Sequence, residues 1–87
     1  MPIRKILVVD DSPVERLALQ EVLSRHGYQV LSAENGEQAI ARSRTEHPDL
    51  ILMDVVMPGM NGYQATRTIS RADETRDIPI IMCTSKG

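Results

Sequence analysis

The chain has 87 residues and a formal net charge of −2, with 41% hydrophobic and 25% charged residues. These proportions are typical of one small globular domain and argue against a disordered chain. The mild negative charge and the lack of Trp and Phe argue against nucleic-acid binding. No apolar run is long enough for a signal peptide or a membrane span. We therefore expect a cytoplasmic protein, and the single cysteine, Cys83, agrees with a reducing compartment.

Strand and helix patterns alternate in the first half of the chain. Residues 4–10 (RKILVVD) are apolar and β-branched, so they predict a strand, and Pro13 suits the first turn of a helix over 13–27 after a cap at Asp11 or Ser12. Residues 28–34 predict a weaker, more polar strand, and 36–47 a second helix. The first helix carries apolar residues at helical spacing that predict one core-facing stripe, namely Val14, Ala18, Leu19, Val22 and Leu23.

The second half repeats the alternation. Residues 49–54 (DLILMD) predict a strand that is apolar on both faces, and Asn61 can cap a third helix over 62–73. Residues 78–84 (IPIIMCT) predict a fourth strand. The order βαβαβαβ indicates an α/β fold, a doubly wound parallel sheet whose polar second strand lies at an edge.

Three acidic residues follow or end the two most apolar of the early strands: Asp10 and Asp11 after the first, and Asp54 at the end of the third. In doubly wound sheets of order 2-1-3-4-5 these strands are neighbours, and ligands bind beyond their carboxyl ends. Two like charges about 4 Å apart repel by on the order of 4 kcal/mol at an effective dielectric constant near 20. Either raised pKa values or a bound cation must compensate, and oxygen ligands of this kind suit Mg²⁺.

Three segments carry a family resemblance. ILVVDDSP, ILMDVVMPGMNG and IPIIMCTSKG are similar to the signature segments of receiver domains in response regulators of bacterial two-component systems, including Pro58 and Gly62 at the family's spacings after Asp54. The resemblance implies a flavodoxin-like fold and one receiver domain over residues 1–87. A weaker likeness, in DSPVERL, AENGEQA and NGYQATR, is to stand-alone receivers of the twitching-motility and chemotaxis type.

The resemblance also implies roles for individual residues. Asp54 would be the phosphoacceptor, taking a phosphoryl group from a sensor histidine kinase, and Thr84 the switch hydroxyl that hydrogen-bonds it. Asp11 would bind Mg²⁺ directly, Asp10 through water, and Asp54 and the backbone carbonyl of Val56 would complete the site. Such a domain controls a downstream protein target and is no enzyme beyond its own phosphotransfer.

The chain departs from the family pattern at its end. The family has an essential lysine on a fifth strand followed by a last helix, whereas this chain ends at Gly87 and its Lys86 follows Thr84 too closely to be that lysine. We therefore expect a chain truncated after its fourth strand. The apolar edge of residues 78–84 would then be exposed, which favours dimerisation or strand exchange.

Three alternatives compete with the receiver interpretation. A pseudo-receiver would use the same fold only for protein docking, but the complete set of acids argues against it. A metal-dependent phosphatase commonly needs a second acid two residues after its nucleophile, and Val56 occupies that position. Dinucleotide binding would require a Gly-x-Gly-x-x-Gly motif after the first strand, which the sequence lacks.

Overall fold

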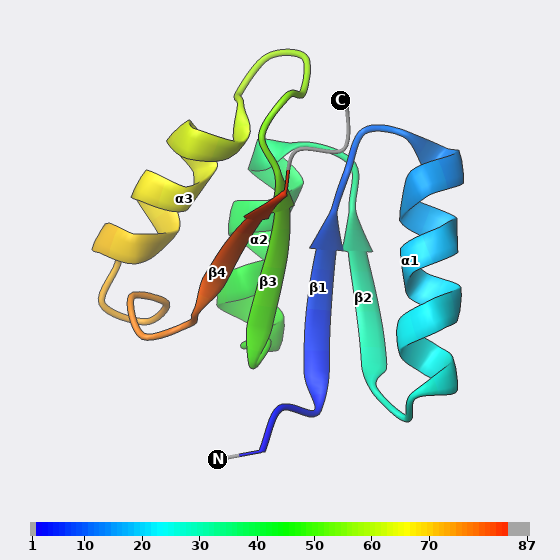
Figure 1. Ribbon diagram of the computed structural model, residues 1–87. Coiled ribbons are helices and arrows are strands. Elements are labelled where there is room, and N and C mark those ends of the chain that lie inside the picture. The colour runs from blue at the N-terminus through cyan, green and yellow to red at the C-terminus, as the bar shows by residue number, and fades with distance from the viewer. Residues whose placement is uncertain (1, 84–87) are drawn as a thin grey trace.

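Four parallel strands form one sheet in the order β2-β1-β3-β4 (Figure 1). The computed structural model describes residues 2–83. Its elements are β1 (Lys5–Val9), α1 (Pro13–Arg25), β2 (Gln29–Ala33), α2 (Gly36–Glu46), β3 (Leu50–Asp54), α3 (Gly62–Arg71) and β4 (Ile80–Cys83). This confirms the predicted doubly wound order, with β2 at one edge and β1 beside β3.

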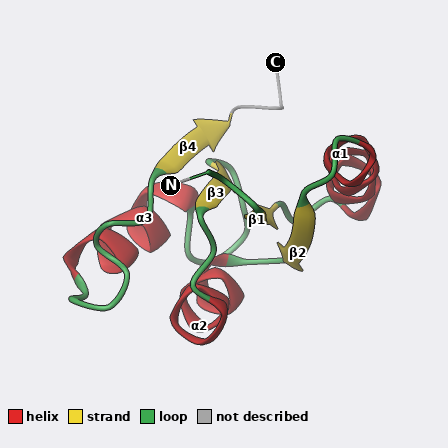
Figure 2. Ribbon diagram, turned by 90° about the horizontal axis from the view of Figure 1, so that it is seen from below, coloured by secondary structure: helices red, strands yellow, loops and turns green. Residues whose placement is uncertain are grey.

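The helices are divided between the two faces of the sheet. Figure 2 shows α1 on one face, and α2 and α3 on the other. Alternate residues of β1 therefore face different helices, with Ile6 and Val8 toward the α1 side. The main core lies between the sheet and the helices α2 and α3, and its buried members are Leu7, Val9, Ala33, Ala39, Ile51, Met53, Met57, Ala65 and Ile69.

Side-chain caps fix where the helices begin. Ser12 accepts from the backbone N–H of Glu15, Asn35 from that of Gln38 and Asn61 from that of Gln64. Gln64 returns a hydrogen bond to the backbone of Asn61, which completes a capping box. These caps satisfy amide groups that have no partner inside the helix. Of the two predicted caps for the first helix the structure uses Ser12, and Asn61 caps the third helix as predicted.

The predicted core-facing stripe of α1 is wrong in part. Leu19 and Leu23 are half-buried against the sheet, but Ala18 is exposed and Val14 and Val22 are 78% and 51% exposed. The reason lies in the position of the helix: α1 packs mainly on β2 and β1, at one side of that face of the sheet (Figure 2). Within residues 2–83 no helix covers β3 and β4 on this face, so part of the apolar stripe has nothing to pack against.

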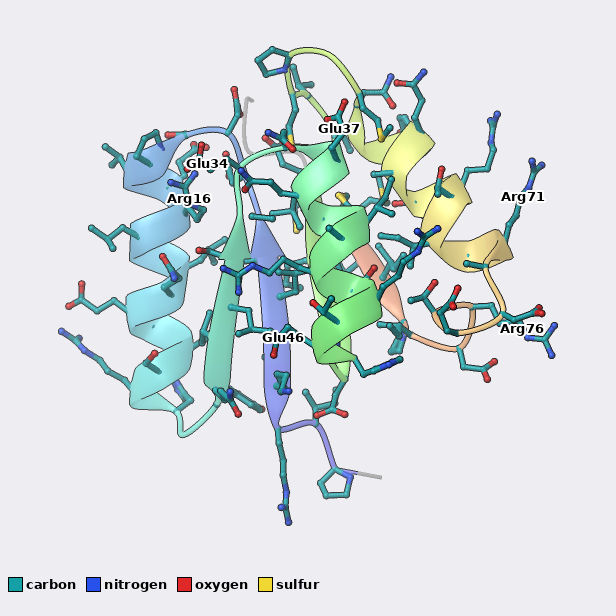
Figure 3. All side chains as sticks on the ribbon, turned by 180° about the vertical axis from the view of Figure 1, so that it is seen from behind. Arg16, Glu34, Glu37, Glu46, Arg71 and Arg76 are labelled. Carbon is teal, nitrogen blue, oxygen red and sulfur yellow. The ribbon has the colours of Figure 1, made fainter. Side chains whose placement is uncertain are left out.

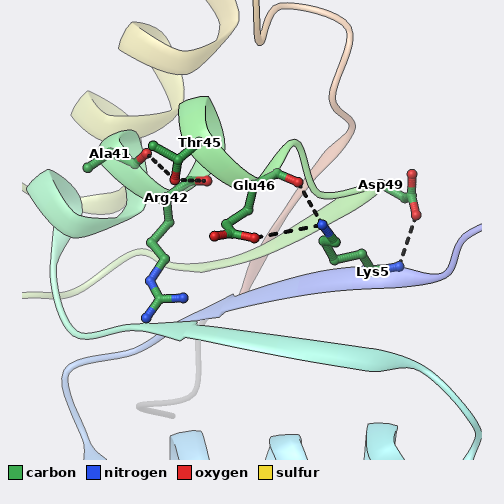
Figure 4. A network of polar contacts seen from close by, with 6 residues as sticks. All are labelled: Lys5, Ala41, Arg42, Thr45, Glu46 and Asp49. Carbon is green, nitrogen blue, oxygen red and sulfur yellow. Dashed lines mark hydrogen bonds and ion pairs between the residues drawn. The ribbon is translucent and has the colours of Figure 1, made fainter.

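Polar contacts close the opposite end of the sheet from the helix caps (Figure 4). Asp49 accepts hydrogen bonds at 2.9 Å from the backbone N–H groups of Arg4 and Lys5, and these bonds lower the pKa of its carboxyl group. The ammonium group of Lys5 donates to the carbonyl oxygen of Glu46 at 2.9 Å. Together these bonds fix the start of β1 against the end of α2 and the residue that precedes β3.

Gly62 allows α3 to approach the end of β3 closely. Its N–H donates to the carbonyl oxygen of Val55 at 3.0 Å, and a Cβ atom placed on it would overlap the carbonyl oxygen of Asp54. The atoms in the way belong to the backbone, so they cannot move aside as a side chain would. Glycine is therefore a packing requirement at this position.

We predict that Gly62→Ala destabilises the protein by about 1–3 kcal/mol, the usual range for overpacking. Urea unfolding followed by circular dichroism would measure the loss. Ser70→Ala, at an exposed position of the same helix, is the matched control and should change stability by less than about 0.5 kcal/mol. Equal stability of Gly62→Ala and the native protein would contradict the close approach.

Candidate functional site

The pairing of β1 with β3 places the sequence-predicted acids together. Val9 is the last residue of β1 and pairs with Met53, so Asp10 and Asp54 follow side by side at the carboxyl ends of two adjacent strands. Both are nearly fully buried, at 4% and 2% exposure, whereas Asp11 is half-buried. One side-chain oxygen from each of the three carboxylates lies within 4.8 Å of the others.

Asp10 is held by hydrogen bonds on several sides. Its N–H donates to the carbonyl oxygen of Ala33 at 3.1 Å, and its Oδ1 accepts from the N–H of Ser12 at 2.9 Å. Its own carbonyl oxygen accepts from Nη1 of Arg16 at 2.7 Å. These bonds therefore fix the backbone where β1 turns toward α1, and this in turn fixes the position of Asp11.

The three carboxylates fit a hard divalent cation. Separations below 4.8 Å allow one ion to contact oxygens from more than one residue, either directly or through water. Carboxylates grouped in this way repel one another, and burial of two of them strengthens the repulsion because water screens it less. The donor set contains oxygen alone, which favours Mg²⁺ over softer metals.

Cys83 lies beside the cluster from the neighbouring strand. It pairs in register with Asp54, and its carbonyl oxygen accepts from the N–H of Val55 at 3.1 Å. Burial raises the pKa of its thiol, and the charges of Asp54 and Asp10 raise it further. The thiol therefore lies close enough to the cluster to experience its negative potential, although it is not one of the three carboxylates.

Other sequence-predicted residues lie at the margin of the site or outside the described part of the chain. Thr84, the predicted switch hydroxyl, falls outside residues 2–83. Val56 is the second residue after Asp54 and its side chain is 58% exposed; the role of its carbonyl stays a prediction. Arg16 is not among the predicted site residues, and the structure places its guanidinium group on the backbone carbonyl of Asp10.

The fold and the acidic cluster define a class of protein: the chain belongs to the response regulator receiver domain family, whose profile matches residues 6–87. The comparisons thereby confirm the family resemblance and favour it over a pseudo-receiver. No helix within residues 2–83 is long and apolar enough to cross a membrane.

Individual relatives sharpen the assignment. The chain is 54% identical over 82 residues to Protein PilH of Pseudomonas aeruginosa, covering 94% of this chain and 68% of PilH. It is 44% identical over 84 residues to the phosphate regulon transcriptional regulatory protein PhoB of the same organism, covering 97% of this chain but 37% of PhoB. PilH is thus the much shorter relative, as the likeness to stand-alone receivers predicts.

One solved structure bears on the metal. The receiver domain of a sensor histidine kinase from Pseudomonas aeruginosa was crystallised with a magnesium ion coordinated in its active-site cleft. It superimposes on this chain with a TM-score of 0.90 and 35% sequence identity, over 98% of this chain and 70% of that one. Receiver domains bind Mg²⁺ in an acidic pocket, and this chain has the corresponding cluster of aspartates.

We predict that the reactivity of Cys83 reports the charge of the cluster. Only the thiolate is alkylated, so the raised pKa should make reaction with iodoacetamide slow at pH 8 and faster as the pH rises toward that pKa. Asp54→Asn removes one of the negative charges and should speed the reaction, whereas Asp77→Asn, at an exposed position near the other end of the sheet, should not. Equal rates in both variants would contradict the proximity of Asp54 to the thiol.

Proposed function

We propose that this chain is the phosphoacceptor part of a two-component signalling protein and that Asp54 receives the phosphoryl group. The observation that carries the proposal is the gathering of Asp10, Asp11 and Asp54 within 4.8 Å at the carboxyl ends of β1 and β3. Membership of the receiver family supports it, because receiver domains are signalling modules that take phosphate from histidine kinases.

Asp54 is the nucleophile in this phosphoryl transfer. A side-chain oxygen of Asp54 attacks the phosphorus of a phosphohistidine in line with the P–N bond. The new O–P bond forms as the P–N bond breaks, and the imidazole nitrogen keeps the bonding electrons. The product is an acyl phosphate on Asp54. Asp54 is the last residue of β3 and is 2% exposed, so the strand and not a flexible loop orients its carboxylate.

Asp10, Asp11, Asp54 and the carbonyl oxygen of Val56 would hold the metal ion. A bound Mg²⁺ supplies charge neutralisation for the phosphoryl oxygens during transfer. Asp11, the most exposed of the three acids, is suited to direct contact with an entering ion, and Asp10, whose Oδ1 already accepts from Ser12, to contact through water. Thr84 would then hydrogen-bond the acquired phosphoryl group, which is the switch read by a partner.

The partners are those that membership of the receiver family implies. A sensor histidine kinase supplies the phosphoryl group, and a downstream protein target reads the change, both in the cytoplasm. The domain catalyses only its own phosphotransfer and is otherwise a signalling module.

We predict that acetyl phosphate with Mg²⁺ labels the full-length protein, with its fifth-strand lysine, on Asp54, as mapped by mass spectrometry after borohydride reduction. Asp54→Asn should reduce labelling to background, and Asp11→Asn should reduce it at least tenfold because a metal ligand is lost. Asp77→Asn keeps the same chemistry away from the cluster and should label normally. Labelling at another residue, or undiminished labelling of Asp54→Asn, would refute the assignment.

We further propose that the 87-residue chain associates through β4. Within residues 2–83 this strand forms the outer edge of the sheet, and Ile81 is 52% exposed on it. Unpaired N–H and C=O groups beside apolar side chains form a template for a strand from another molecule. Pairing of two β4 edges, or exchange of the strand between two copies, would satisfy these groups.

The 87-residue chain should therefore be dimeric in light scattering at micromolar concentration. Ile81→Lys places a charge on the exposed edge and should shift the mass toward the monomer. Val22→Lys, at an exposed apolar position on α1, controls for a general effect of added charge and should leave the dimer intact. A monomeric native chain at high concentration would rule out this association.

A further inference from the structure

We propose that Arg16 is a positioning residue for the metal site, one that holds Asp11 in its ligating direction through the backbone of Asp10. The inference rests on the proposed function and extends it to a residue outside the acidic cluster. The observation behind the inference is the hydrogen bond of 2.7 Å from Nη1 of Arg16 to the carbonyl oxygen of Asp10. Figure 3 shows Arg16 on the first turn of α1, at the end of the molecule where the strands carry the acids.

The carbonyl group of Asp10 controls the geometry of Asp11. Because the peptide bond is planar, this oxygen, the N–H of Asp11 and the Cα atom of Asp11 lie in one rigid plane. The N–H of Asp10 is bound to Ala33, which fixes the preceding side of the residue. Arg16 fixes the following side. A rotation of the peptide that turned the Asp11 side chain away from the cluster would break the bond from Arg16.

The sheet does not hold this carbonyl in place of Arg16. The last paired residue of β1 is Val9, opposite Ala33 in β2 and Met53 in β3. Asp10 therefore stands one residue beyond the end of both ladders, where the strand turns toward α1. The carbonyl group of Asp10 lies beyond the paired residues of the strand, and a charged donor at 2.7 Å is a strong hydrogen-bond partner for it.

Arg16 is itself held firmly enough to position something else. Its N–H donates to the carbonyl oxygen of Ser12 at 2.9 Å, and the side chain of Ser12 caps the same turn by accepting from the N–H of Glu15. Pro13 restricts the backbone between them. Arg16 is half-buried, and its planar guanidinium group loses less freedom per hydrogen bond than a lysine would.

Positioning and charge predict opposite effects on metal affinity, which makes the two separable. As a positive charge near the cluster, Arg16 should repel a cation, so its removal would tighten Mg²⁺ binding. As a positioning residue it should favour the cation, so its removal would weaken binding. The hydrogen bond to Asp10 takes none of the carboxylate oxygens. We therefore expect the positioning effect to be the larger one.

The test is a titration of the purified protein with MgCl₂, followed by amide NMR shifts at Asp11 and Asp54. Arg16→Met should bind Mg²⁺ roughly tenfold more weakly, the effect typical of residues that orient a metal ligand. Arg16→Lys keeps the charge and one donor and should recover part of the affinity. In the metal-free state the Asp11 amide shift should move in Arg16→Met.

Arg25→Met is the matched control, because it removes an arginine from the other end of the same helix, where the residue pairs with exposed Glu21. Its affinity and its Asp11 shift should equal those of the native protein. Circular dichroism confirms that each variant is folded at the titration temperature. If Arg16→Met unfolds, the Arg16→Lys variant decides alone: affinity equal to that of the native protein would overturn the inference.

The outcomes separate the inference from the proposed function. If the native protein binds no Mg²⁺, the proposed function fails and the role of Arg16 fails with it. If the native protein binds Mg²⁺ and Arg16→Met binds it equally well or more tightly, Arg16 is not a positioning residue, while the proposed function stands. Weaker binding in both Arg16→Met and Arg25→Met would show a general effect of α1 and would also overturn the inference.

Discussion

Repulsion between carboxylates held at the ends of neighbouring strands is the constraint on which this structure depends. The pairing of β1 with β3 brings Asp10 and Asp54 together while both are buried, and Asp11 lies close enough to share one ion with them. The sheet core supplies the stability that allows this. Leu7, Val9, Ile51 and Met53 are fully buried on the two strands that carry the acids. A site with unfavourable electrostatics is thus built on the most firmly packed part of the fold.

Hydrogen bonds from neighbouring elements then fix the acids in detail. Ser12 and Arg16 hold the side chain and the carbonyl of Asp10, and both belong to the capped start of α1. On the other strand, the N–H of Gly62 binds the carbonyl of Val55, next to Asp54. Each acidic strand end is therefore attached to the first turn of the helix that follows it. Preorganisation of this kind keeps ligand atoms in place before an ion arrives.

Much of this arrangement could be predicted from residue patterns, and the exceptions have physical reasons. Alternating strand and helix signals predicted a parallel sheet covered on both faces. The strand order was in part what the family resemblance implies, and with that order the acids at the ends of the apolar strands predicted the cluster. The exposure of Val14 and Val22 could not be predicted. Periodicity shows that apolar residues share one side of α1, but it does not show whether another element packs against that side. The positions of Arg16 and Cys83 beside the acidic cluster could not be predicted either. Their roles depend on a carbonyl beyond the end of a ladder and on the register of β4.

The absence of a side chain at Gly62 has a mechanical consequence. Because Gly62 has no Cβ atom, the backbone at the start of α3 lies in direct contact with the carbonyl oxygen of Asp54 at the end of β3. The capping box of Asn61 and Gln64 stiffens the same junction. A displacement of the Asp54 main chain would therefore be transmitted directly to the first turn of α3, with no side chain between them to absorb it.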